Sequence, residues 1–191
     1  MLSRSTTWAF EADKVNEFAY MNNAFSKEEC LKIIELGESL EMQIGTTVSN
    51  SVARNSQISW IFPTEESAWI FRRVIDICMS LNNQFFKFDL FGLVEGFQFT
   101  KYSDPDGFYG AHIDKVYDNI VRKLSITIQL SDPNDYEGGE LELHIKSDPL
   151  VMQKDLGYLV VFPSYTLHQV KPVTKGTRYS LVAWVTGTPF K

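Results

Sequence analysis

Cysteine is nearly absent from the chain. Cys30 and Cys78 are the only two in 191 residues, and both fall in stretches with helical periodicity. A disulfide framework and a Cys-x-x-Cys metal or redox site are therefore excluded, and a reducing, cytoplasmic location is expected. Long apolar runs are also missing, at the N-terminus as elsewhere. The sequence therefore predicts neither a signal peptide nor a membrane-spanning helix.

Basic residues are not in excess either. Lysine and arginine number 18 against 24 aspartates and glutamates, which gives a net charge of −6. This balance argues against a nucleic-acid-binding surface and a polybasic membrane contact, so neither partner is expected. An anionic ligand would need a local cation. With 44% hydrophobic and 14% aromatic residues, the composition predicts a single globular domain over 1–191.

The first part of the chain, about 1–88, is expected to supply helical support. A capping box at Ser26–Glu29 predicts the start of a helix. The residues expected on its buried face are Leu31, Ile34 and Leu40. A second helix is expected from about Thr64, where apolar residues recur with the 3.6-residue period of an amphipathic helix packed on a sheet.

From about residue 89 the hydrophobic period changes to two, and Asp-Pro and glycine-rich turns separate the apolar segments. The expected strands are 93–102, 109–114, 123–130, 140–145, 158–162, 168–173 and 178–185. Many short strands without intervening helices predict a mainly β fold with flanking helices, an antiparallel sandwich or jelly roll at about 89–188. The N-terminal helices are expected to pack on one of its sheets.

Three residues have the chemistry of a metal site. His112 and Asp114 are two apart on a strand-like segment, a spacing that points both side chains to one side. His168 follows a later apolar strand. Two imidazoles and one carboxylate on one face of an octahedron leave three positions open, as in non-haem Fe(II) oxygenases. The alternative is a chance His-x-Asp pair with a solvated downstream histidine.

Arg178 and His144 are the other two residues considered for this site. Arg178 lies ten residues after His168 and offers a planar fork to a dicarboxylate held at the metal. A surface ion pair is the alternative for this arginine. His144 alternates with apolar residues beside Glu140 and Glu142. It is therefore interpreted as a residue of the sheet face and not as a ligand.

Three blocks of sequence occur in an order that resembles a known family. They are Tyr102–Asp114, which ends in His-x-Asp, then Leu130–Leu141 with its Gly-Gly-Glu-Leu, then His168–Trp184. Together they resemble the Fe(II)- and 2-oxoglutarate-dependent dioxygenases, prolyl-4-hydroxylase-like branch, over roughly residues 54–186. The resemblance implies a double-stranded β-helix core of the jelly-roll or cupin-like type. It also implies Fe(II), 2-oxoglutarate and O2 as cofactors, with ascorbate as a reductant.

The same resemblance implies roles for individual residues. His112, Asp114 and His168 would be the iron ligands, and Arg178 would bind the distal carboxylate of 2-oxoglutarate. Tyr102 matches a tyrosine that helps to hold this cosubstrate. A polar stripe at Ser125, Thr127 and Gln129 runs along an otherwise apolar strand, and a buried polar stripe needs partners. The resemblance places the cosubstrate against this strand, so Thr127 and Gln129 are candidates for its second anchor.

On the substrate side the expected residues are Tyr109, Trp184 and Arg54. Core filling is the alternative for Trp184, and a surface salt bridge is the alternative for Arg54. The implied reaction is hydroxylation of an unactivated C–H bond with release of succinate and CO2, most simply on a prolyl residue of a peptide or protein. A free amino acid or small metabolite is the second candidate. A noncatalytic jelly-roll binding module and a cupin-type isomerase or hydrolase are alternatives of other classes, the last disfavoured by the scarcity of histidines.

Overall fold

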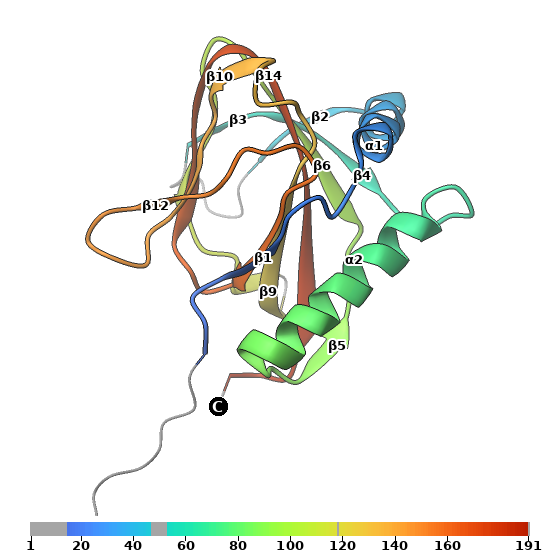
Figure 1. Cartoon of the computed structure of the whole chain (residues 1–191), viewed down its shortest axis with the longest axis vertical. Helices are drawn as coiled ribbons and strands as arrows, with labels where there is room; N and C mark the ends of the chain where they lie inside the picture. Colours follow the sequence, from blue (N-terminus) through green and yellow to red (C-terminus); the bar gives the residue numbers. More distant parts are fainter. Residues whose placement is uncertain (1–14, 47–52, 118, 191) are drawn as a thin grey trace, which may run out of the picture.

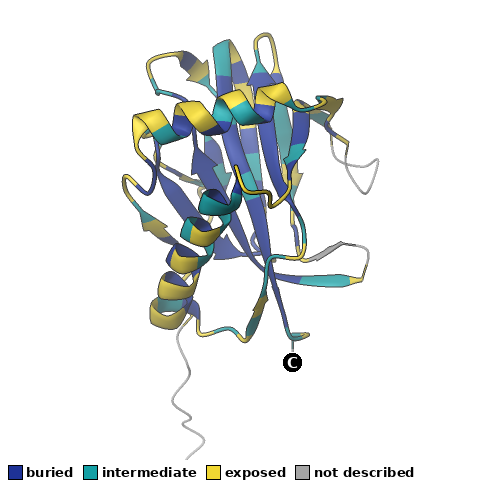
Figure 2. Cartoon of the chain, turned by 90° about the vertical axis from the view of Figure 1, so that its right-hand side faces the viewer, coloured by how far each residue is buried: buried dark blue, intermediate teal, exposed yellow. Residues whose placement is uncertain are grey.

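Two helices cover one face of a large antiparallel sheet in the computed structural model, which describes residues 15–46, 53–117 and 119–190 (Figure 1). They are α1 (Lys27–Ser39) and α2 (Ala68–Leu81). Figure 2 shows their exposed outer faces and the buried strands behind them. The main core fills the space between these helices and the sheet.

The capping box predicted for α1 is present. The Ser26 hydroxyl accepts a hydrogen bond from the backbone N–H of Glu29, and the Glu29 carboxylate accepts one from the Ser26 N–H. The predicted burial of Leu31 is wrong, because this side chain is 53% exposed. The buried face instead carries Cys30, Ile33 and Gly37. Gly37 explains the rotation, since a Cβ there would lie 2.3 Å from the ring of Phe99, and only this narrow side of the helix allows such a close approach.

Helix α2 begins at Ala68, a few residues after the predicted start. A turn precedes it in which the Ser67 hydroxyl accepts from the backbone of Thr64 and donates to the carbonyl of Phe62. Its buried residues follow the predicted periodicity and are Ile70, Val74, Ile77, Cys78 and Leu81. The helix continues into a π-helical turn, η1 (Asn82–Phe86).

The larger sheet is antiparallel and runs in the order β1-β13-β9-β14-β6-β4-β2. Its strands are β1 (Ala19–Met21), β13 (Leu159–Pro163), β9 (Ile120–Gln129), β14 (His168–Gly187), β6 (Phe97–Ser103), β4 (Gln57–Ile61) and β2 (Gln43–Ile44). A short strand, β5 (Leu90–Gly92), pairs with the end of β14. The N-terminal part of the chain therefore contributes strands as well as helices.

A smaller sheet is built on the first half of β14. The strands that pair with it are β7 (Gly107–His112), β10 (Tyr136–Gly138) and β11 (Leu141–Leu143). Outside them, β3 (Arg54–Asn55) pairs with β7, β12 (Leu150–Val151) pairs with β11, and β8 (Val116–Tyr117) forms a hairpin with β9. The two sheets make the jelly-roll core, so the predicted fold class is confirmed.

Strand β14 corrects one prediction. The sequence suggested two strands, 168–173 and 178–185, separated by a Pro- and Gly-containing turn. The structure has one strand of 20 residues, with register shifts against β7 between His168 and Val170 and again before Val173. Irregular pairing absorbs the Pro and the Gly while the strand passes from the smaller sheet into the larger one. One strand therefore carries both His168 and Arg178.

Both cysteines are buried in helices as free thiols. Burial raises the pKa of Cys30 and of Cys78 to about 12. A thiol with so high a pKa is a poor nucleophile and a poor metal ligand near neutral pH. Within the described ranges, no helix is both long enough and apolar enough to cross a membrane.

Candidate active site

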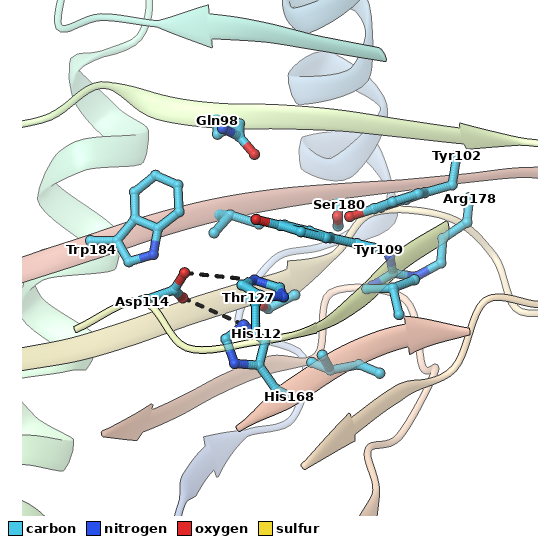
Figure 3. Close-up of a pocket in the computed structure, with 13 residues that line it drawn as sticks. Gln98, Tyr102, Tyr109, His112, Asp114, Thr127, His168, Arg178, Ser180 and Trp184 are labelled. Atoms are coloured by element: carbon cyan, nitrogen blue, oxygen red, sulfur yellow. Dashed lines mark ion pairs between the residues drawn. The ribbon is translucent and has the colours of Figure 1, made fainter. Parts of the chain in front are cut away.

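Three side chains with metal-binding atoms meet where β7 ends and β14 begins. His112 is the last residue of β7, His168 is the first of β14, and the two are cross-strand partners. Nε2 of His112 lies 3.7 Å from Oδ1 of Asp114, and Nε2 of His168 lies 3.4 Å from Oδ2, as the dashed lines in Figure 3 show. All the candidate ligand atoms lie within 4.8 Å of one another.

Asp114 reaches this group from a loop. The sequence placed it on a strand covering 109–114, but β7 ends at His112. Its backbone N–H donates to the carbonyl of Ser164 at 2.8 Å, and its carboxylate accepts from the Ser125 hydroxyl at 2.8 Å. These two bonds, and not strand geometry, place the carboxylate between the imidazoles.

Both imidazoles are held in one tautomer. Nδ1 of His112 lies 2.8 Å from the carbonyl of Gly110, and Nδ1 of His168 lies 2.9 Å from the carbonyl of Thr166. A carbonyl oxygen only accepts hydrogen bonds, so each Nδ1 must carry the proton. Each Nε2 then keeps its lone pair, directed at the shared point beside Asp114, an arrangement typical of metal-binding histidines.

The charge states agree with that geometry. Burial, helped by the neighbouring His168, lowers the pKa of His112 to about 4, so this ring is neutral at physiological pH. Burial favours the neutral form of Asp114, but the two histidines and the Ser125 hydrogen bond outweigh it and hold its pKa below the ordinary value. The group therefore presents the neutral nitrogen of His112 beside the anionic carboxylate of Asp114.

A divalent metal ion fits this donor set. With metal–ligand bonds of about 2.1 Å, three ligands on one face of an octahedron lie about 3 Å apart. The separations of 3.4 and 3.7 Å are only slightly wider. Nitrogen and oxygen donors without a thiolate suit iron in its ferrous state. Among the described residues this is the one cluster with metal-ligand spacing, and His144 is not part of it.

Arg178 forms the opposite end of the same pocket (Figure 3). Its side chain is only 1% exposed. Nε and Nη2 both donate to Oε1 of Gln129, at 3.2 and 2.8 Å, while Nη1 is buried without a hydrogen-bond partner among the described residues. A buried cation whose contacts are neutral carries a large desolvation cost. The unpaired Nη1 and the uncompensated charge fit the far carboxylate of a dicarboxylate.

Strand β9 connects the two ends of the pocket through the predicted polar stripe. Ser125 holds Asp114, Thr127 lines the pocket, and Gln129 holds Arg178. Gln129 thus uses its acceptor oxygen on the arginine. Tyr102 also lines the pocket, and its ring centroid lies 5.3 Å from the guanidinium carbon of Arg178.

The three residues expected on the substrate side lie around the triad. The Tyr109 ring stacks on His112, with centroids 3.6 Å apart and planes 16° apart, and the guanidinium of Arg54 lies 4.4 Å from the Tyr109 centroid. Trp184 lines the pocket and also packs on Trp60, with centroids 6.2 Å apart. Trp184 is thus both a pocket residue and a core residue.

Sequence reasoning missed residues that line this pocket and several that lie around it. Gln98 lines it and accepts a hydrogen bond from Arg54. The alternation of polar and aromatic residues along β6 could have indicated Gln98. No local pattern points to Glu95, which pairs with Arg122 beneath Trp184. The same holds for Tyr136, whose buried hydroxyl lies beside Arg178.

The jelly roll and the His-Asp-His cluster with its distal arginine are the features expected of an oxygenase of the Fe(II) and 2-oxoglutarate type. Residues 97–186 match the 2OG-Fe(II) oxygenase superfamily. A PKHD-type hydroxylase of Prochlorococcus marinus (strain MIT 9515) is 34% identical over 158 residues, which cover 79% of this chain and 66% of that protein. These matches support a 2OG-Fe(II) oxygenase.

Other relatives align over a shorter segment. A PKHD-type hydroxylase from another strain of Prochlorococcus marinus is 41% identical over 93 residues, covering 48% of this chain and 42% of that protein. One from Gloeothece citriformis is 48% identical over 80 residues, covering 40% and 36%. The matched part of the chain thus spans about two fifths of the length of these relatives.

Solved structures agree on the fold. A prolyl-4-hydroxylase of Pseudomonas putida superposes with a TM-score of 0.70 at 22% identity, covering 91% of this chain and 94% of that one. A prolyl hydroxylase from Trichoplax adhaerens, in complex with a hypoxia inducible factor peptide fragment, gives a TM-score of 0.75 at 21% identity, covering 90% and 84%. At these identities the likeness shows a shared fold.

Proposed function

We propose that this protein is an Fe(II)- and 2-oxoglutarate-dependent dioxygenase that hydroxylates an unactivated C–H bond. One observation carries the proposal: a facial set of metal-binding atoms and a buried, uncompensated arginine share one pocket. When bound there, Fe(II) with 2-oxoglutarate and O2 supplies the oxidising chemistry, and succinate and CO2 are released.

In this proposal the metal ligands are His112, Asp114 and His168. The backbone carbonyls of Gly110 and Thr166 keep both imidazoles ready to coordinate, so little reorganisation is needed when the metal enters. The Asp114 carboxylate supplies the negative charge that favours a dication over a neutral ligand.

Arg178 binds the distal carboxylate of 2-oxoglutarate, and Gln129 orients it. The two bonds from the guanidinium to Gln129 leave Nη1 for the cosubstrate. Tyr102 and Thr127 form the walls between this end and the metal. Excluding water from the pocket strengthens the pairing of guanidinium and carboxylate.

The substrate in this proposal is a prolyl residue of a peptide or protein, bound beside Tyr109, Trp184 and Arg54. Support comes from the names of the similar proteins, which are hydroxylases of the PKHD and prolyl types. A free amino acid or small metabolite is the second candidate. We assign the whole chain, 1–191, to one catalytic domain, and the two free buried thiols are compatible with a cytoplasmic location.

The experiment is succinate formation from 2-oxoglutarate by the protein loaded anaerobically with Fe(II) and then exposed to O2. Wild type should produce succinate, and Asp114→Ala should produce none above the no-enzyme rate. Glu66→Ala, which removes an exposed acid from the turn before α2, is the matched control and should behave as wild type. Equal succinate release by wild type and Asp114→Ala would overturn the proposal.

A further inference from the structure

Among the described residues, the groups that hold Arg54 are neutral. Its Nε donates to the Ser56 hydroxyl at 2.7 Å, its Nη2 donates to Oε1 of Gln98 at 2.9 Å, and its guanidinium stacks on the Tyr109 ring. The alternative of a surface salt bridge does not hold in the described parts of the chain, where no carboxylate lies within ion-pair distance of it. Its positive charge is therefore uncompensated by these residues.

Arg54 lies close to the candidate metal ligands. Strand β3 places Arg54 opposite Tyr109 in register, and Tyr109 stacks directly on His112. Gln98 and Tyr109, which both touch Arg54, line the pocket. The guanidinium is thus separated from a candidate metal ligand by a single aromatic ring.

The arginine is also ordered in advance. Two hydrogen bonds and one stacking contact fix a long side chain that would otherwise lose considerable rotamer entropy on binding a ligand. A half-buried guanidinium with neutral acceptors retains a strong preference for an anionic partner, because its charge is only partly solvated. Arg54 and Gln98 resemble Arg178 and Gln129 in that a glutamine side chain accepts a hydrogen bond from a guanidinium.

We propose that Arg54 is a specificity-determining residue that binds a carboxylate of the substrate, close to the carbon that reacts. This inference rests on the proposed function and narrows its substrate class: the prolyl compound carries a carboxylate next to the reacting ring. Three sources share this chemistry, namely an acidic side chain in a peptide, the C-terminal carboxylate of a peptide, and the carboxylate of free proline.

The test uses substrate pairs that differ only in one carboxylate. They are a proline peptide with Glu or Gln beside the proline, a peptide ending in proline as acid or amide, and L-proline against L-prolinamide. The readouts are succinate formation, a mass gain of one oxygen, and calorimetric binding of the same compounds to the metal-free protein. In at least one pair the acid should have a KM and a Kd about tenfold lower than the amide, and that pair identifies the source.

Variants assign the preference to Arg54. Arg54→Gln should abolish the ratio of acid to amide affinities, whereas Arg54→Lys should retain part of it, because the charge stays but the fork is lost. Lys101→Gln is the control, since Lys101 pairs with Glu38 away from the pocket, and it should leave the ratio unchanged. If Arg54→Gln unfolds, the salt dependence of the wild-type ratio replaces it, since a charge interaction weakens as ionic strength rises.

The outcomes distinguish a failure of the proposed function from a failure of the carboxylate inference. Absence of succinate under all conditions contradicts the proposed function. Succinate formation with equal affinities for acid and amide in every pair overturns the carboxylate inference alone. A ratio that survives Arg54→Gln, or that does not change with salt, does the same. Failure of every carboxylate form to bind or to stimulate turnover also overturns it.

Discussion

The two ends of the pocket are incomplete in opposite ways. At one end an anion, Asp114, lies between two imidazoles that direct lone pairs at the same point. At the other end Arg178 is buried with a neutral amide as its hydrogen-bond partner. The first arrangement requires a cation and the second an anion. A molecule that chelates a metal and ends in a carboxylate satisfies both, which is why neither end alone defines the cosubstrate.

The largest expected effect comes from removing the charge at the metal end. Asp114→Ala should weaken Mn(II) or Co(II) binding at least about 100-fold, since even the loss of an outer partner of a metal ligand costs 10- to 100-fold. Anaerobic calorimetric titration measures it. The same variant should leave the hydrogen bonds between Arg178 and Gln129 unchanged. Metal affinity within threefold of wild type would show that the ligand assignment is wrong.

Removing the charge at the other end should have opposite effects on function and stability. Arg178→Met should weaken 2-oxoglutarate binding on the order of 100-fold, about 3 kcal/mol, because the buried charge pair cannot form. The ligand-free variant should melt about 3 °C higher than wild type, since it no longer buries an unpaired cation. Calorimetry on the Mn(II)-loaded protein and thermal unfolding of the metal-free protein measure the two effects. A lower melting temperature would contradict the view that Arg178 lacks an anionic partner.

The metal end should also make the metal-free protein sensitive to acid. His112 has a pKa of about 4 in the folded state and about 6.5 when unfolded. The unfolded chain therefore takes up the proton first, and stability falls as the pH drops from about 6.5 toward 4. The contribution is ~3 kcal/mol, measurable by urea unfolding at several pH values. His112→Asn should flatten this part of the profile, and an unchanged slope would contradict the assignment.

A smaller effect is expected from the residue that holds the arginine. Gln129→Glu would give Arg178 an internal anion that competes with the cosubstrate, so the KM for 2-oxoglutarate should rise about tenfold while kcat changes little. Gln129→Leu removes the acceptor without adding charge and serves as the comparison. A tighter KM in Gln129→Glu would indicate that Gln129 contacts the cosubstrate in another way.

The central part of the site could be predicted from the sequence. His112 and Asp114 are neighbours in the chain, and His168 and Arg178 occur in the expected order within strand-like sequence. The strand pattern and the amphipathic period of α2 were sufficient for the fold class. These signals are local, so a single sequence carries them.

The remaining features depend on register and packing. The bond between Gln129 and Arg178 exists because β9 and β14 pair with Gln129 opposite Ser180, a relation that no spacing along the chain reveals. The contact between Gln98 and Arg54 joins two strands 44 residues apart. The orientation of α1 depends on the close approach of Gly37 to Phe99, so three apolar positions alone did not determine it.

The position of β14 in the chain has a consequence for biosynthesis. This strand is translated after every strand with which it pairs, yet it lies at the centre of the larger sheet between β9 and β6. While β14 is still inside the ribosome, the nascent chain exposes two unpaired strand edges, on β9 and β6. It also lacks both His168 and Arg178. Iron capture should therefore be a late event in the life of the polypeptide, and the unfinished chain is the form that most needs protection by chaperones.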